Sequence, residues 1–175
     1  MPQRTPPVAS VIVPTYSRPL QLERCLQALA GQQFNEAWEI IIVDDGSPSP
    51  VDQAVITRLF GSSTQPVVQL LRQDNAGPAS ARNSGVSNAN GLLVAFTDDD
   101  CQPNPTWLRD LVQCWRENPQ ALIGGTTING LTDNSYSSTS QLIVDLVYRR
   151  FNSDPTDSYF LASNNILCSR SQYLE

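Results

Sequence analysis

Short apolar runs rich in β-branched residues alternate with segments of helical apolar spacing along this 175-residue chain. The runs predict strands at residues 8–13, 39–43, 67–71, 92–97 and 122–128, and a strand or edge segment at 159–168. The helical spacing predicts helices over 18–32, 51–60, 78–89, 107–115 and 142–151, and the polar segment 129–140 is expected to be a long mobile loop. Alternating strands and helices are typical of α/β proteins with right-handed crossovers. We therefore predict a three-layer sandwich around a mainly parallel central sheet.

The composition excludes several classes of function. A hydrophobic fraction of 40% and a charged fraction of 16% are typical of a folded globular domain rather than a disordered chain. The formal charge is −6 and the basic residues form no stripe, so nucleic acid is not an expected partner. The chain contains no histidine, which excludes histidine general bases, Ser-His-Asp triads and most zinc sites.

The cysteines and the apolar runs indicate the compartment. Cys25, Cys101, Cys114 and Cys168 show no CxxC spacing, and we expect them to be reduced side chains of a cytosolic protein. Residues 1–7 are expected to be flexible and lack the apolar core of a secretion signal, and no apolar stretch approaches 18 residues. We therefore expect a cytoplasmic protein without a transmembrane segment. Peripheral attachment to the inner face of a membrane stays open.

Three consecutive carboxylates, those of Asp98, Asp99 and Asp100, directly follow the expected strand 92–97. Two carboxylates ~4 Å apart repel each other by about 1 kcal/mol in water and about 4 kcal/mol at an effective dielectric constant of 20. A divalent cation is the usual group that offsets such repulsion. The alternative is an acidic loop in solvent. A turn-forming segment, residues 101–105, follows the triplet, which favours the metal site.

A second acidic pair, Asp44 and Asp45, ends the expected strand 39–43. Ligands of parallel sheets bind outside the carboxyl ends of the strands, where both acidic sets and residues 14–16 are expected to meet. Tyr16 could stack on a nucleobase, a carboxylate could accept its N–H groups, and a cation could hold phosphates. For residues 45–47, ordinary turn chemistry is the alternative, and Asp44 or Ser47 could simply cap the next helix.

No glycine-rich phosphate loop accompanies these residues. The sequence has no G-x-G-x-x-G motif after the first strand, and it has no G-x-x-x-x-G-K-[ST] motif at any position. A metal ion would therefore have to neutralise most of the phosphate charge.

Four segments in this order resemble the family 2 inverting glycosyltransferases with the GT-A fold. They are residues 10–16 (SVIVPTY), 41–47 (IIVDDGS), 75–85 (NAGPASARNSG) and 96–100 (FTDDD), with weaker similarity at 124–125 and 162–165. The resemblance implies a Rossmann-like GT-A domain over residues 8–175. It also implies transfer of a sugar, with inversion, from a nucleotide-diphosphate sugar (most typically a UDP-sugar) to a glycan or lipid-linked acceptor in glycan or polysaccharide biosynthesis.

The same resemblance implies roles for residues in the first three motifs. Pro14, Thr15 and Tyr16 would line the nucleobase pocket, and Asp45, together with Asp44, would hydrogen-bond the base. Arg82 would lie near the base or the diphosphate; the alternative is a helix residue paired with a nearby acid.

The resemblance also assigns the acidic triplet and a pair of asparagines. Asp98 and Asp100 would form a D-x-D motif, in which Asp100 binds Mn²⁺ or Mg²⁺ directly and Asp98 contacts the ribose or the metal shell. Asp99 belongs to the nucleotide-sugar-binding set, although as the middle residue it can also point away. Asn164 and Asn165 resemble a segment near the sugar or acceptor pocket, and backbone hydrogen bonds at a turn are the alternative.

The general base is the part of the family pattern that this sequence lacks. Family members carry an Asp or Glu beyond the region that matches Ser169 and Arg170, and we expect the base to lie beyond Glu175 in a domain truncated before that segment. Two hypotheses follow: a glycosyltransferase represented by its donor-binding half, and a non-catalytic nucleotide-sugar-binding or interaction module. A phosphotransferase with an Asp-x-Asp nucleophile is the weakest hypothesis, because those enzymes carry the acid pair after their first strand.

Overall fold

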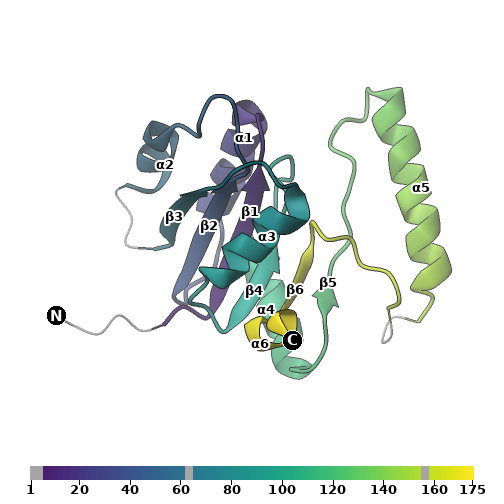
Figure 1. The fold of residues 1–175 in the computed structure, drawn as a ribbon. Coiled ribbons are helices and arrows are strands. Elements are labelled where there is room, and N and C mark those ends of the chain that lie inside the picture. Colours follow the sequence, from purple (N-terminus) through teal and green to yellow (C-terminus); the bar gives the residue numbers. More distant parts are fainter. Residues whose placement is uncertain (1–5, 62–64, 155–157) are drawn as a thin grey trace.

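A computed structural model describes residues 6–61, 65–154 and 158–175 and confirms the alternation of strands and helices (Figure 1). The strands are β1 (Ala9–Thr15), β2 (Trp38–Asp44), β3 (Val67–Arg72), β4 (Leu93–Phe96), β5 (Ile123–Gly124) and β6 (Ile166–Ser169). They form one sheet in the order β3-β2-β1-β4-β6-β5. The first four are parallel, and β6 runs antiparallel to both of its neighbours. Residues 1–5 of the segment 1–7, which is expected to be flexible, lie outside the described residues.

Helices cover both faces of this sheet, as expected for three layers. The helices of the described residues are α1 (Pro19–Ala30), α2 (Gln53–Phe60), α3 (Pro78–Ser87), α4 (Trp107–Glu117), α5 (Ser135–Phe151) and α6 (Arg170–Leu174), of which α5 covers neither face. The buried core on one face joins α1, α2 and α4 to the sheet, and the core on the other face joins α3 and α6. None of the helices in the described residues is long and apolar enough to cross a membrane. All four cysteines are free, as expected.

The central strands are buried on both faces because their side chains alternate between the two cores. In β1, Val11 and Val13 pack into one core and Ile12 into the other. Burying one such side chain stabilises the fold by roughly 1.5–3 kcal/mol. This packing fixes the register of β1 and β2, and therefore fixes which residues emerge at the carboxyl ends of the strands.

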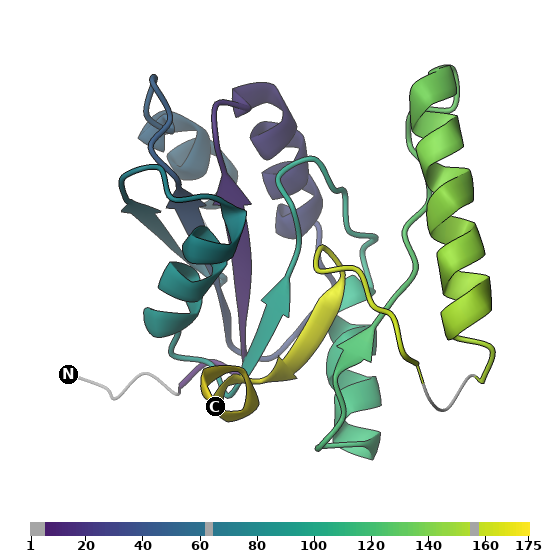
Figure 2. The same cartoon turned by 45° about the vertical axis from the view of Figure 1, so that its right-hand side comes forward.

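The expected loop over residues 129–140 is wrong in its second half, because α5 begins at Ser135. The side chain of Asn134 accepts a hydrogen bond from the Ser137 amide (3.0 Å) and caps the helix. A run of Ser and Thr read as a loop is therefore the first turn of a helix. None of the residues of α5 is buried, and Figures 1 and 2 show this helix standing beside the β5 edge of the sheet.

Two expected strands are much shorter in the structure. The segment 122–128 contributes only Ile123–Gly124. Beyond it the Gly125 amide still donates to the Asn165 carbonyl (3.1 Å), but the Asn165 amide donates to Ala162 (3.1 Å) and does not return the hydrogen bond to Gly125. The segment 159–168 contributes only the strand that starts at Ile166. The chain then continues into α6, and Ser169 and Gln172 form a capping box at its start.

Candidate functional site

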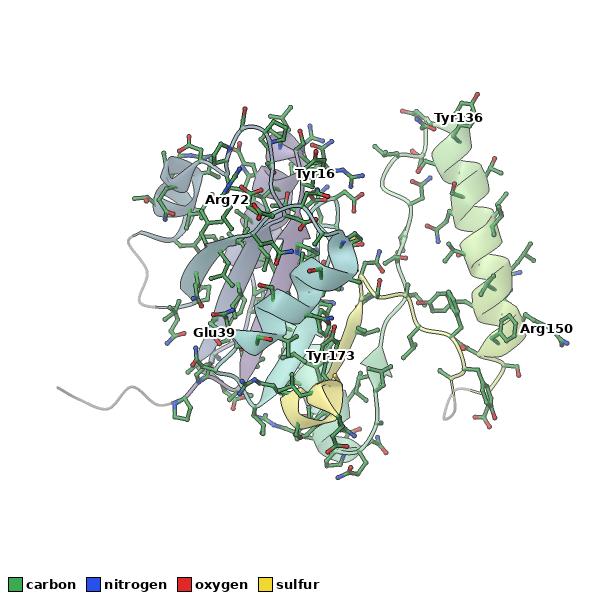
Figure 3. The ribbon with its side chains drawn as sticks, viewed as in Figure 1. Tyr16, Glu39, Arg72, Tyr136, Arg150 and Tyr173 are labelled. Carbon is green, nitrogen blue, oxygen red and sulfur yellow. The ribbon has the colours of Figure 1, made fainter. Side chains whose placement is uncertain are left out.

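A cavity of about 330 Å³ lies at the carboxyl ends of β1, β2 and β4. Its lining residues are Pro14, Thr15, Tyr16, Arg18, Asp45, Pro78, Arg82, Asp98 and Asp99. Seven of these are sequence-predicted site residues, so the topology brings the first, second, third and fourth motifs together as expected. Figure 3 shows Tyr16 at this end of the sheet, on the same side as Arg72 and opposite Glu39 and Tyr173. The predicted residues Asp44, Asp100, Asn164 and Asn165 do not line this cavity.

Asp44 and Asp45 are adjacent in sequence but have different positions: Asp45 lines the cavity and Asp44 does not. Asp44 is buried below the cavity, where its carboxylate accepts hydrogen bonds from the amides of Ser47 (2.9 Å) and Val51 (3.3 Å) and from the guanidinium of Arg72. Burial alone would raise the pKa of Asp44, but these donors and the charge of Arg72 outweigh it and lower the pKa. Asp44 therefore fixes the turn after β2. The alternative that Asp44 or Ser47 caps the next helix is wrong, because the N-cap of α2 is Asp52.

Asp45 reaches the cavity and also organises the loop that precedes α3. Its two carboxylate oxygens accept hydrogen bonds from the side chain of Gln73 (2.8 Å) and from the amides of Ala76 (3.0 Å) and Gly77 (2.8 Å). Gly46 follows with φ +78°, and a Cβ there would lie 2.7 Å from the Asn75 amide nitrogen. Only glycine allows this close approach of the two loops.

Two arginines from opposite sides of the cavity pair with the acidic triplet. Arg82, on α3, donates to Asp98 at 2.5 Å, so it is both a cavity residue and the partner of a nearby acid. Arg18 places one nitrogen, Nη1, 3.3 Å from an oxygen of Asp99 and 3.1 Å from an oxygen of Asp100. Each carboxylate of the triplet therefore has a guanidinium partner, which offsets the repulsion among the three.

The middle carboxylate does not point away from the site. Asp99 is 4% exposed, the most buried of the three, and accepts a hydrogen bond from the hydroxyl of Thr15 (2.7 Å). Burial and the neighbouring Asp100 raise its pKa, against the opposing effects of Thr15 and Arg18. Asp99 thus attaches the triplet to the end of β1, while Asp98 and Asp100 keep side-chain exposed fractions of 32% and 53%.

A second cavity, of about 420 Å³, lies on the other side of the triplet. It is lined by Asp100, Cys101, Asn164 and Asn165, together with Trp107 and residues of the segment 126–130. The antiparallel direction of β6 explains this position: its first residue, Ile166, pairs with Phe96, so the preceding asparagines lie beside the end of β4. The predicted asparagines therefore lie close to the triplet, but not in the first cavity.

The two asparagines are held differently. Asn165 accepts a hydrogen bond from the indole of Trp107 (2.8 Å) and donates to Thr126, which agrees with the alternative that it satisfies groups at a turn. Asn164 donates to the sulfur of Cys101 (3.5 Å), and its side-chain oxygen is buried without a hydrogen-bond partner. Of the pair, Asn164 has an acceptor left over for a ligand.

The triplet fits a divalent cation only together with a ligand that brings further oxygens. Within the described residues, no group of three or more His, Cys, Asp and Glu side chains is arranged to hold a metal ion. Mg²⁺ is usually bound by one or two carboxylates together with water and substrate phosphates, and Mn²⁺ also prefers carboxylate and water oxygens. The partly exposed carboxylates of Asp98 and Asp100 meet this requirement.

Arg18 and Gln73 contact the predicted site residues although no sequence motif predicts them. A basic residue after the first motif carries no signal by itself, because its approach to Asp99 and Asp100 depends on the turn at Ser17. Ser17 has φ 56°, in the left-handed region that favours glycine, and its amide donates to the hydroxyl of Ser47 (2.9 Å). The only sequence signal was the position of Arg18 directly before Pro19, which begins α1.

Comparison with protein families gives a match over residues 10–173 to the model of "Glycosyl transferase family 2". The chain belongs to glycosyltransferase family 2. Among curated relatives, the glycosyltransferase AglE of Haloferax volcanii is 31% identical over 122 residues, which are 69% of this chain and 40% of AglE. This chain thus spans less than half the length of that relative.

Solved structures identify the fold as GT-A. The mannosyltransferase PcManGT of Pyrobaculum calidifontis, in complex with GDP-Man and Mn²⁺, superposes with a TM-score of 0.72 over 98% of this chain and 47% of its own. At 18% identity, this likeness concerns the fold alone. The S. aureus TarS 1–349 structure in complex with UDP-GlcNAc is 29% identical, with a TM-score of 0.57 over 70% of this chain and 35% of its own.

Proposed function

We propose that this family 2 domain binds a nucleotide-diphosphate sugar together with Mn²⁺ or Mg²⁺ and transfers the sugar, with inversion, to an acceptor hydroxyl. One observation carries the proposal: a single cavity combines an aromatic ring, arginines and carboxylates at the carboxyl ends of three parallel strands. A nucleotide diphosphate offers a flat base, a ribose and phosphates, and each of these can bind one of those groups. The ligands named for the similar structures, UDP-GlcNAc in TarS and GDP-Man with Mn²⁺ in PcManGT, support it.

The base would bind at the end of the cavity formed by Tyr16 and Asp45. The Tyr16 ring is half exposed and can stack on a base, flanked by Pro14 and Thr15. Asp45 already accepts three hydrogen bonds, but a carboxylate has about four acceptor positions, so one remains for an N–H group of the base. Asp44 would support the base only through the turn that it fixes.

The diphosphate would bind between Arg82 and the acidic triplet. A guanidinium can donate two parallel hydrogen bonds to phosphate oxygens, and the Nε of Arg82 is buried without a partner. Asp98 and Asp100 would hold the divalent cation, which supplies charge neutralisation of the diphosphate as a leaving group. Asp99 would keep the triplet in place through Thr15.

The sugar and the acceptor would occupy the second cavity, because Asp100 separates it from the first. The free oxygen of Asn164 would accept a hydrogen bond from a sugar or acceptor hydroxyl. The base that removes the acceptor proton, a step that accounts for roughly 10²–10⁴ in rate, is proposed to lie beyond Glu175. A glycan or lipid-linked acceptor at the cytoplasmic face of a membrane is the proposed setting.

Calorimetric titration with UDP-GlcNAc and GDP-Man, each with Mn²⁺ or with EDTA, tests the donor site. We expect at least one donor to bind, with Mn²⁺ strengthening its binding, and Asp100→Asn to remove the Mn²⁺ effect. Asp110→Asn is the matched control, since Asp110 is exposed on α4. Equal affinity in Mn²⁺ and in EDTA would disprove the metal role, and failure of both donors to bind would disprove the donor site for these two nucleotide sugars.

The second hypothesis, a non-catalytic nucleotide-sugar-binding module, shares this donor site. Transfer of the sugar to an acceptor by the 175-residue chain would refute it, whereas donor binding without transfer would support it.

A further inference from the structure

Arg18 is the least expected member of the site and the more exposed of the two arginines of the cavity. Its Nη1 atom is shared between Asp99 and Asp100, at 3.3 and 3.1 Å. Its side chain is 53% exposed, whereas that of Arg82, the other arginine of the cavity, is 15% exposed. Arg18 can therefore move without disturbing the core, and Arg82 cannot.

The backbone, in contrast, holds Arg18 firmly at the edge of the cavity. The left-handed turn at Ser17 is stabilised by the hydroxyl of Ser47, and Pro19 starts α1 directly afterwards. A non-glycine residue in this conformation is uncommon and persists only where its surroundings fix it. The turn thus directs a long cationic side chain towards the triplet and leaves its end free to move.

The position of Arg18 conflicts with the binding of a divalent cation at Asp100. A guanidinium and a divalent cation on the same carboxylate repel each other, and the cation carries the larger charge. Asp99 does not face this conflict in the same way, because it is buried and anchored by Thr15. When Asp100 binds the cation, Arg18 loses one of its two partners, and its side chain can turn into the cavity that it already lines.

We propose that Arg18 is a positioning residue that holds Asp100 in the absence of the cation and turns to the diphosphate of the donor when the cation takes its place. This inference rests on the proposed function and adds to it an exchange of partners. It implies two opposite effects of one side chain: Arg18 weakens binding of the cation alone, and it strengthens binding of a nucleoside diphosphate once the cation is bound.

Binding of Mn²⁺ alone, and of UDP and GDP at saturating Mn²⁺, tests the exchange. For Arg18→Ala we expect Mn²⁺, measured by the electron paramagnetic resonance of the free ion, to bind about three- to tenfold more tightly, because the competing charge is removed. At saturating Mn²⁺ we expect the nucleoside diphosphate that binds wild type to bind the variant about three- to tenfold more weakly, because a phosphate contact is lost. Arg18→Lys, which keeps the charge, should lie close to wild type in both titrations. Arg109→Ala, on the exposed side of α4, is the matched control and should change neither.

The opposite signs separate a positioning role from a structural one. If Arg18→Ala only loosens the site, both ligands bind more weakly, and the proposal is overturned. Unchanged Mn²⁺ affinity in Arg18→Ala also overturns it, even where Mn²⁺ and nucleotide bind normally. If neither Mn²⁺ nor a nucleoside diphosphate binds wild type or any variant, the donor site fails with the proposal, an outcome distinct from the other two.

Discussion

Replacing Asp44 by Asn tests whether this residue fixes the turn after β2 or contacts a ligand. Its buried carboxylate accepts hydrogen bonds from two backbone amides and from Arg72. A hydrogen bond to a charged group contributes about 1.5–3 kcal/mol, and the share of the half-exposed Arg72 is smaller because solvent screens it. Asparagine keeps one oxygen for one amide but turns an NH₂ group towards the remaining donors. We expect the free energy of unfolding to fall by about 2–3 kcal/mol.

The loss has a defined dependence on pH. Because the folded-state pKa of Asp44 is lowered, its contribution is complete above the unfolded-state pKa and is lost as the pH falls through the folded-state value. The difference between wild type and Asp44→Asn should therefore be constant from pH 7 to pH 5 and shrink below about pH 4. Urea unfolding followed by circular dichroism at each pH measures it, and at pH 7 the melting temperature should fall by about 5–10 °C.

Asp52→Asn provides the matched control for this substitution. Asp52 caps α2 from an exposed position, and asparagine caps a helix about as well as aspartate, so this change should cost less than about 0.5 kcal/mol. The reasoning is refuted if the two variants are equally stable at pH 7, or if their difference already shrinks between pH 7 and pH 5. After allowance for any unfolded fraction, nucleotide affinity should be the same in both variants and wild type.

Two further substitutions test the two cavities. Tyr16→Ala should weaken binding of UDP or GDP, whichever wild type binds, by roughly 1–3 kcal/mol measured by calorimetry, because a stacking ring is lost; Tyr16→Phe should retain binding, and an equal loss in both would exclude stacking. Trp107→Phe should lower the free energy of unfolding by about 1–3 kcal/mol in a urea titration, because the buried oxygen of Asn165 loses the indole as its donor. Trp115→Phe is its control, since the indole N–H of Trp115 is buried without a partner; a larger loss in this control would contradict the hydrogen-bond argument.

The sequence could predict the parts of the site that depend on strand ends. Tyr16, Asp45 and Asp98 each follow a strand whose apolar run is unmistakable, and the parallel order of those strands brings their ends to one edge. The same rule could not separate Asp44 from Asp45. Which of two adjacent carboxylates is buried depends on the residue at which the strand ends. It also depends on Arg72, which lies on the neighbouring strand β3 and donates to Asp44.

Other features depend on contacts that no local pattern encodes. Arg18 reaches the triplet only because Ser17 adopts a left-handed turn, which a hydroxyl from another strand end stabilises. The start of α5 was missed because Ser, Thr and Asn favour both loops and helix caps, and only the hydrogen bond of the Asn134 side chain decides between them. The short β5 follows from one backbone amide, that of Asn165, which donates to Ala162 and not to Gly125.

The isolation of α5 has a consequence for the evolution of acceptor choice. This helix has no buried residue, and its contacts with the rest of the protein include hydrogen bonds of Tyr148 with Gly125 and Ala162 and of Gln141 with Thr127. These contacts adjoin the segment 126–130, which walls the second cavity, whereas the first cavity is built on buried strands. Substitutions in α5 can therefore reshape one wall at little cost in folding, and we expect diversification to accumulate there while the nucleotide side stays constant. Amide hydrogen exchange should reveal the same division as fast exchange in α5 and slow exchange in β1 and β2.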